Sequence, residues 1–270
     1  MVSVLVLTLN EEQNLPDCLS SVSWCTDVVV LDSLSSDRTV EIAKAWGARV
    51  VQRQFDNWAA HQNWALANIK FDNRWVFYLD ADERMTRELR DEILQIARDG
   101  DDSKAAYYCG RRNYFMGRWI KHAMPPGAIM RFFRPDRVHF ERLVNPTPVI
   151  SGRHGYLQNY FDHYNFSKGI ADWIERHNKY STLEAIEGVK LFAGERNHEA
   201  SVLSSDPAAR RKALKEFSFR LPLRPFLKFI YMYLFKGGFL DGYPGYVYCR
   251  LQAMYEHMIV LKMRELRRPI

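Results

Sequence analysis

The sequence predicts an α/β fold in which helices flank a mainly parallel central sheet, and two observations predict it. Four apolar runs of strand length occupy residues 2–9, 27–31, 49–52 and 75–79. Stretches with helical spacing separate these runs and begin near Glu11, Asp37 and Asn57. Such an alternation builds a parallel βαβ sheet. With 270 residues, 47% of them hydrophobic, the chain can bury a large core.

The later elements follow from punctuation and spacing. Ser35, Ser36 and Asp37 can cap the second helix, and Gly47 suits the position just after its end. Between residues 105 and 162 the pattern is irregular, which favours mixed strands and loops, and helical spacing returns at 173–188. We expect one domain over residues 1–206, with halves at 1–104 and 105–206, and a basic amphipathic C-terminal helical region at 207–270.

The basic charge of the chain is concentrated in this C-terminal region. Residues 207–270 carry a net charge of +9, whereas the first 206 residues carry −3. The apolar, aromatic run at 226–235 lies in the same region, and this combination favours an anionic membrane surface over nucleic acid. A basic helical hairpin packed on the main domain is the alternative. No run reaches the roughly 18 apolar residues of a membrane span, and no basic leader precedes the first strand, so we expect a cytoplasmic protein.

Polar side chains follow three of the predicted strands. They are Thr8, Asn10 and Glu11 after the first strand, Asp32 and Ser33 after the second, and Asp80 and Asp82 after the fourth. Ligands of parallel sheets bind at the carboxyl ends of the strands, so we expect these side chains to converge on one cleft. The four cysteines lack metal-ligand spacing, which indicates reduced structural thiols.

The acids after the fourth strand indicate a cation. Two carboxylates about 5 Å apart repel by roughly 3 kcal/mol at an effective dielectric near 20, so a positive group belongs beside Asp80, Asp82 and Glu83. Hard oxygen ligands suit Mg²⁺ or Mn²⁺, and such a metal typically bridges a diphosphate. The chain has no Gly-rich dinucleotide fingerprint after a strand and no Walker lysine loop, so neither a dinucleotide enzyme nor a P-loop NTPase is supported. Structural alternatives exist for single residues: Asn10 as a helix cap, Asp32 as a turn former and Glu83 as an acid in a first helical turn.

Four ordered motifs carry a resemblance to a known family. They read VLTLNEE at 6–12, VLDSLSSDRT at 30–39, QNWAL at 62–66 and LDADE at 79–83. Together they closely resemble the inverting family 2 glycosyltransferases, which have the nucleotide-diphospho-sugar transferase fold called GT-A. RNYFMGRWI at 112–120 and HYNF at 163–166 resemble the branch that builds lipopolysaccharide cores and related surface glycans.

The resemblance implies roles for residues that match the motifs. It places Thr8, Asn10, Glu11 and Asn63 with the nucleotide, Asp32 at the base or ribose, and Asp80 near the ribose and diphosphate. It makes Asp82 of this DxD element the ligand of Mn²⁺ or Mg²⁺, and it sets Arg131 against the diphosphate or the acceptor. Residues 1–104 then form the nucleotide-sugar-binding half of the domain, and 105–206 the acceptor half.

The chain departs from the family at the expected catalytic base. Related transferases commonly carry a Val-His-Glu motif where this chain has Val144-Asn145-Pro146. An inverting transfer needs a carboxylate that takes the proton of the acceptor hydroxyl. Glu141 is our first candidate and Asp162 the second. The alternative for Glu141 is a salt bridge, to Arg142, Arg134 or Arg137.

The resemblance therefore predicts an inverting, metal-dependent hexosyltransferase that uses a nucleotide diphosphate sugar, UDP-linked by preference. The expected acceptor is a lipid-linked glycan such as lipopolysaccharide core or exopolysaccharide, at the inner face of the cytoplasmic membrane, and no nucleic-acid partner is expected. Arg111, Arg112, Trp119 and Lys121 could meet an anionic acceptor, although Trp119 also suits a core. Two alternatives remain: a nucleotide-sugar-binding or degenerate transferase without a working base, and a basic module that binds nucleic acid or membrane.

Overall fold

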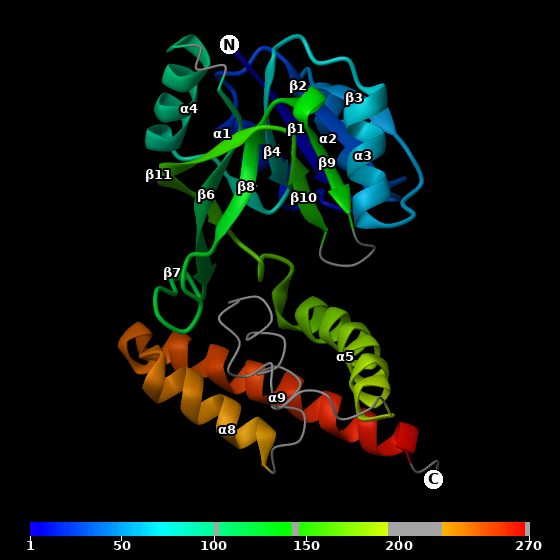
Figure 1. Ribbon diagram of the computed structural model, residues 1–270, viewed down its shortest axis with the longest axis vertical. Helices are drawn as coiled ribbons and strands as arrows, with labels where there is room; N and C mark the ends of the chain where they lie inside the picture. Colours follow the sequence, from blue (N-terminus) through cyan, green and yellow to red (C-terminus); the bar gives the residue numbers. More distant parts are fainter. Residues whose placement is uncertain (100–102, 142–145, 194–222, 268–270) are drawn as a thin grey trace. The chain divides into compact units, whose positions relative to one another are not determined.

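The computed structural model describes residues 1–99, 103–141, 146–193 and 223–267, and Figure 1 shows the helices and strands that they form. The chain divides into two compact units. The first comprises Met1–Tyr114 with Pro125–Ser167, and the second comprises Phe115–Met124 with Lys168–Ile270.

The first unit is built on a mixed, mainly parallel sheet with the strand order β3-β2-β1-β4-β8-β6-β11-β5. Its strands are β1 Val2–Thr8, β2 Val28–Asp32, β3 Arg49–Gln52, β4 Trp75–Asp80, β5 Glu83–Arg84, β6 Lys104–Phe115, β8 Ala128–Phe133 and β11 Arg153–His163. The first four strands are parallel, β8 is antiparallel to β4 and β6, and β11 is parallel to β6. The four predicted strands and the mixed strands after residue 105 are confirmed.

The helices of the first unit are α1 Leu15–Ser21, α2 Thr39–Ala45, α3 Trp58–Asn68 and α4 Arg87–Asp99. A 3-10 turn, Pro135–Arg137, leads into β9 Val138–Glu141, which pairs with β10 Thr147–Ile150 in a small antiparallel sheet. Gly47 has φ +78° and follows α2 as predicted, and Asn57 caps α3 by accepting the Ala60 N–H at 2.9 Å. The predicted start near Glu11 is wrong by four residues, because α1 begins at Leu15.

The caps predicted for α2 are only partly right. The Asp37 carboxylate accepts the Thr39 N–H at 3.0 Å. The two serines instead bond the loop itself, with the Ser35 N–H donated to Asp32 and the Ser36 N–H to Asn10. The structural alternative for Glu83, an acid in a first helical turn, does not apply, since Glu83 lies in β5.

The core lies on both faces of the sheet, which explains the nearly continuous apolar runs of its central strands. Val4, Val6, Phe77 and Leu79 pack in a cluster with residues of α1, α2 and α4. Their neighbours Leu5, Leu7, Val76 and Tyr78 pack in a second cluster with residues of α3. Burial on both faces holds β4 in place. Asp80 at its end, and Asp82 and Glu83 just after it, are therefore positioned by a rigid strand.

The second unit is helical. It contains α5 Gly169–Ala193, α8 Arg224–Ile230, a π-helical turn η2 Tyr231–Phe235, a 3-10 turn η3 Gly238–Asp241, α9 Gly242–Arg267 and the short strand β7 Arg118–Trp119. Both α5 and α8 pack against α9. Ala185, Ile259 and Met263 form its core, and Arg224 pairs with Glu256 at 2.7 Å. The predicted helices at 173–188 and in the C-terminal region are confirmed, whereas residue 206, our expected boundary, lies outside the described residues.

Two further findings concern membranes and thiols. Within the described ranges, no helix combines the length and the apolar character that a membrane span requires. All four cysteines are free thiols, as the sequence predicted.

Candidate functional site

The carboxyl ends of the central strands bring several predicted residues to one edge of the sheet. Thr8 at the end of β1 lies opposite Asp32 at the end of β2, and Leu7 lies opposite Asp80 at the end of β4. The Thr8 hydroxyl donates to Asp32 Oδ1 at 3.0 Å. The convergence predicted for this edge is therefore present.

Asp32 is a fully buried carboxylate that organises the loop after β2. Besides Thr8, the Ser35 N–H and hydroxyl donate to it, and Gln52 Nε2 donates at 3.1 Å. These donors satisfy the buried charge and fix the loop. A base or ribose would reach Asp32 only by replacing one of them.

Asn10 and Glu11 connect the loops after β1 and β2. Asn10 has φ +55°, a left-handed conformation that Asn tolerates better than most residues, and its Oδ1 accepts the Ser36 N–H at 2.8 Å. The Glu11 N–H donates to Thr39 Oγ1 at 2.7 Å, and Glu11 Oε2 accepts from Asn14 Nδ2. The two loops form one cross-linked wall beside the strand ends.

Arg131 of β8 supplies a positive group among the acids after β4. Its Nη2 lies 2.6 Å from Asp80 Oδ2 and 2.7 Å from Glu83 Oε1. Glu83 is fully buried, and its Oε2 accepts the Asp80 N–H at 3.0 Å. Burial and the nearby charge of Asp80 raise the pKa of Glu83, although Arg131 acts in the opposite direction. The sequence predicted a cation here, and the protein provides one of its own.

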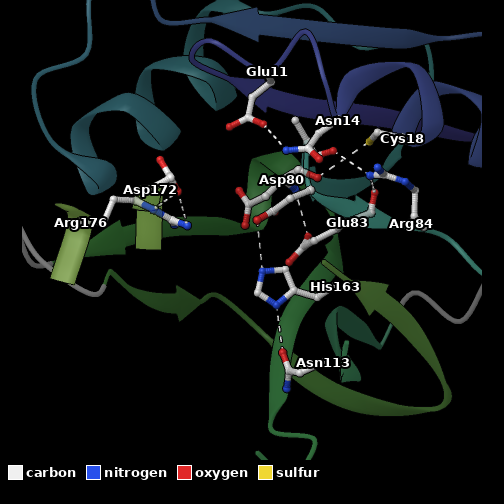
Figure 2. A network of polar contacts seen from close by, with 12 residues as sticks. Glu11, Asn14, Cys18, Asp80, Glu83, Arg84, Asn113, His163, Asp172 and Arg176 are labelled. Carbon is white, nitrogen blue, oxygen red and sulfur yellow. Dashed lines mark hydrogen bonds and ion pairs between the residues drawn. The ribbon is translucent and has the colours of Figure 1, made fainter. Parts of the chain in front are cut away.

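Asp82 faces a histidine that sequence reasoning missed. Asp82 Oδ2 lies 3.4 Å from His163 Nε2. Asn113 Oδ1 accepts from His163 Nδ1 at 2.9 Å, as Figure 2 shows. The pairing of β5 with β11 sets Glu83 opposite His163, which brings the histidine to the acidic loop. The sequence signal that could have identified His163 as a site residue was its position in the HYNF motif at 163–166.

Arg84 braces the same loop from the other end. Its Nη1 donates to the backbone oxygens of Ala81 at 2.8 Å and Glu83 at 2.9 Å. A polar hollow lies beside it, lined by Gln13, Asn14 and Tyr164 among others. The two bonds from Arg84 close the acidic loop on itself, while Arg131 and the Tyr164 N–H, which donates to the Asp82 oxygen at 2.9 Å, tie it to other elements.

The donor set fits a divalent metal that arrives with a phosphate ligand. Across the described parts of the chain, no three His, Cys, Asp or Glu side chains are grouped to hold a metal by themselves. Asp80 is engaged by Arg131 and Asp82 faces an imidazole, and both carboxylates are partly exposed. Mg²⁺ and Mn²⁺ are commonly held by one or two carboxylates while phosphates and water complete the shell. Asp80 and Asp82 are thus the carboxylates that could contact such a metal.

The two candidate bases lie in different surroundings. Glu141, at the end of β9, has a side chain 63% exposed, with Oε1 3.5 Å from His139 Nε2. Asp162 Oδ1 lies 2.5 Å from Arg112 Nε, and strand alternation sets Asp162 on the face opposite His163. Three residues near Glu141 lie outside the described residues: Arg142, and Val144 and Asn145 of the motif that differs from the family's Val-His-Glu. Arg134 and Arg137 pair with Asp136.

The remaining predicted residues have structural partners. Asn63 Nδ2 donates to the Phe140 oxygen at 2.8 Å and its Oδ1 accepts the Phe140 N–H at 2.7 Å, which ties β9 to α3. Burial lowers the pKa of Arg111. In the second unit, Lys121 Nζ lies 4.7 Å from the centre of the Trp119 ring.

Comparisons with known proteins give consistent results. The family model described as Glycosyl transferase family 2 matches residues 3–162, more than half of the chain. An uncharacterized glycosyltransferase of Rickettsia typhi is 26% identical over 278 residues, which cover 98% of this chain and 87% of that protein. The lipopolysaccharide core biosynthesis glycosyltransferase LpsC of Rhizobium meliloti is 25% identical over 277 residues, which cover 97% of this chain and 91% of LpsC.

A solved structure shows a similar fold. The mannosyltransferase PcManGT from Pyrobaculum calidifontis, in complex with GDP-Man and Mn²⁺, matches with a TM-score of 0.51 at 16% identity. The match covers 99% of this chain and 88% of that chain.

Proposed function

The chain belongs to glycosyl transferase family 2, and from this membership we propose that it moves a sugar from a nucleotide diphosphate donor to a lipid-linked glycan. Its mixed α/β fold is that of the GT-A glycosyltransferases. The similarity to LpsC supports an acceptor such as lipopolysaccharide core, with exopolysaccharide as the related choice. A UDP-hexose donor and transfer with inversion complete the proposal.

The observation that carries the proposal is the acidic end of β4. Asp80 and Asp82 follow a strand whose end lies beside Thr8 and Asp32, at the edge where parallel sheets bind ligands. Arg131 holds Asp80 and His163 faces Asp82, and we assign the metal to Asp82. PcManGT is described with GDP-Man and Mn²⁺, and we extend a divalent metal and a nucleotide sugar to this chain as part of the proposal.

Each group has a task in this proposal. The metal, when bound, neutralises charge on the departing diphosphate. Asp82 contacts the metal, and His163, itself held by Asn113, orients the Asp82 carboxylate. The walls formed by Asn10, Glu11 and the Asp32 loop position the nucleotide.

Glu141 is the proposed base that takes the proton of the acceptor hydroxyl, with Asp162 second. The ion pair between Asp162 and Arg112 favours Glu141, because the Asp162 carboxylate is already engaged by a side chain of its own sheet. Residues 1–104 serve the donor and 105–206 the acceptor in this proposal. The protein acts in the cytoplasm, peripherally on the inner face of the cytoplasmic membrane.

A second function is a nucleotide-sugar-binding protein without turnover. The observation that favours it is the pairing of both candidate bases, Glu141 with His139 and Asp162 with Arg112. Binding of the donor without transfer to any acceptor would assign this function.

Thermal unfolding with and without ligands tests the donor site. The protein is heated with UDP, GDP, CMP or dTDP and their common sugars, each with and without Mn²⁺. A ligand at about one hundred times its Kd stabilises by about 2.7 kcal/mol. We expect a shift with UDP-sugars that requires Mn²⁺ and is lost in Asp82→Asn, while Asp91→Asn on α4 retains it. No shift with any nucleotide, or a shift indifferent to Asp82, contradicts the proposed donor site.

A further inference from the structure

The second unit exposes a group of apolar side chains near the start of α9. This aromatic patch consists of Leu234, Phe235, Phe239, Leu240 and Tyr243, whose exposed fractions are 52%, 80%, 48%, 57% and 66%. They come from η2, η3 and the first turn of α9. Large apolar side chains that are exposed as a group typically mark an interaction site, whereas apolar residues exposed singly are normal on any protein surface.

Aromatic contacts join the elements that carry the aromatic patch. The Tyr233 ring in η2 lies 6.3 Å from the Phe239 ring in η3 and 5.8 Å from the Tyr246 ring in α9. A Cβ on Gly238 would lie 2.8 Å from both Cys249 Sγ and the Met232 oxygen. The turn η3 therefore packs closely against η2 and α9, and these packed elements hold the side chains of the aromatic patch in position.

A buried carboxylate holds a basic loop beside the aromatic patch. Asp241 accepts the backbone N–H groups of Lys121 at 3.0 Å, His122 at 3.0 Å and Ala123 at 2.8 Å. This clamp fixes the loop that contains Lys121 to the end of η3. Lys121 and the nearby Arg118 are both exposed.

The charge around the aromatic patch has one sign. Asp241 is the only acid between residues 223 and 255, and residues 115–124 contain none. Because Asp241 is buried, its charge is turned inward to the loop it clamps. The exposed Lys236 and Arg250 add to the positive charge, and Lys236 Nζ lies 5.6 Å from the centre of the Tyr231 ring. Lys228 is turned to Glu256 instead, at 3.9 Å. The surface thus combines exposed aromatic and aliphatic groups with cations.

We propose that the aromatic patch and its flanking cations dock the protein on a bilayer that contains anionic phospholipid. Aromatic side chains favour the headgroup region, and apolar burial adds to electrostatic attraction there. Each basic residue near an anionic surface strengthens binding about fivefold. The exposed Leu234 and Leu240 favour a lipid surface over nucleic acid, which offers little to aliphatic side chains. Only the biological reason for docking rests on the proposed function: docking would give the protein access to a lipid-linked acceptor.

Sedimentation with vesicles tests the docking, without donor or acceptor. The full chain is mixed with vesicles of phosphatidylethanolamine, with and without phosphatidylglycerol. We expect binding that requires phosphatidylglycerol and falls about tenfold or more in the double variant Leu234→Ser, Phe235→Ser. The double variant Lys236→Glu, Arg250→Glu should also bind the vesicles less tightly than the original protein. Added salt should reduce this difference in affinity.

Matched controls make the outcomes decisive. Lys44→Glu with Trp46→Ser alters an exposed cation and an exposed aromatic residue on the first unit, and this variant should bind vesicles as the original protein does. Circular dichroism establishes that every variant is folded. Failure of the original protein to bind, or equal binding by the patch variants, overturns the docking. Loss of a dimer in the patch variants, seen by light scattering without vesicle binding, assigns the patch to a second copy and also overturns it. The nucleotide-dependent thermal shift of the patch variants reports on the transferase proposal separately.

Discussion

Arg131 is the residue on which the acidic end of β4 depends. It is buried with Glu83, which has no exposed surface, and both of its acidic partners lie within 2.7 Å. Removing one partner of a buried ion pair leaves an uncompensated charge, which typically costs about 3 to 5 kcal/mol. Asp80 is partly exposed, so solvent compensates some of that charge and the low end applies.

We therefore predict that Arg131→Met lowers the free energy of unfolding by about 3 kcal/mol, measured by urea denaturation. Arg131→Lys should cost less, because it keeps the charge but loses the planar fork. Arg137→Met, at a half-exposed arginine, should change stability by less than about 0.5 kcal/mol. Wild-type stability in Arg131→Met would show that the acids do not need this cation.

His163 is the residue whose role is most open to measurement. It stands between Asn113 and Asp82, and groups that orient a metal ligand typically contribute about ten- to hundredfold to metal affinity. We predict that His163→Ala weakens Mn²⁺ binding at least about tenfold, measured by electron paramagnetic resonance of the free ion in the presence of UDP. His154→Ala, on the same strand, should leave Mn²⁺ binding unchanged. Equal losses in both variants would indicate a general effect on β11.

Asp27 makes the fold sensitive to acid. Burial raises the pKa of Asp27, but the Ser3 hydroxyl, the Asp72 N–H and Arg49 lower it overall below its ordinary value. A lowered pKa means that the ionised form stabilises the fold. That stabilisation is complete above the ordinary pKa of about 3.9 and is lost as pH falls through the lower pKa of the folded state.

The expected result is a stability that falls as pH drops below about 4, with a smaller fall in Asp27→Asn. Urea denaturation at a series of pH values measures both slopes. Asp17→Asn, at a largely exposed carboxylate, is the comparison and should retain the wild-type slope. An unchanged slope in Asp27→Asn would assign the acid sensitivity to other carboxylates.

At the scale of elements, Asn63 joins α3 to β9 through both ends of its amide. Asn63→Ala leaves the Phe140 N–H and oxygen without these partners, so we predict a loss of about 2 kcal/mol in unfolding free energy. Asn68→Ala, which removes an exposed bond to Trp64, should cost much less. Nucleotide affinity is then measured under conditions in which both variants are fully folded. A loss of affinity in Asn63→Ala alone indicates that Asn63 contacts the nucleotide, whereas unchanged affinity assigns Asn63 to holding β9.

The sequence predicts elements well where burial alone determines them. The strands from Val2 and Trp75 are nearly all apolar because both faces of the sheet are covered, and that pattern is local. The Asp80 and Asp82 edge follows from the same strands. Glu83 and His163 could not be placed this way, because the two-residue β5 pairs with a strand some eighty residues later. Asn10 in a left-handed conformation likewise depends on Ser35 and Ser36 in another loop.

At the scale of the molecule, each of the two units has its own packed core. A substitution at one glycine of the second unit tests whether the two units unfold separately. A Cβ on Gly245 in α9 would lie 2.2 Å from the Gly238 oxygen and 2.6 Å from Asp241 Cβ. We predict that Gly245→Ala forces these elements apart and costs about 1 to 3 kcal/mol of stability. Hydrogen exchange should show lost protection in η3, α9 and residues 118–123, with β1 and β4 unchanged. Equal loss throughout the chain would mean that the two units unfold as one.

The order of strands in the sheet also affects how the chain is made. β1 lies between β2 and β4, and β4 ends at Asp80, so a growing chain carries an apolar strand that lacks one neighbour until that residue has left the ribosome. An unpaired strand that is apolar on both faces can associate with other chains. β4 in turn lacks its neighbour β8 until Phe133 has been made, so chaperones have most to protect while these strands are unpaired.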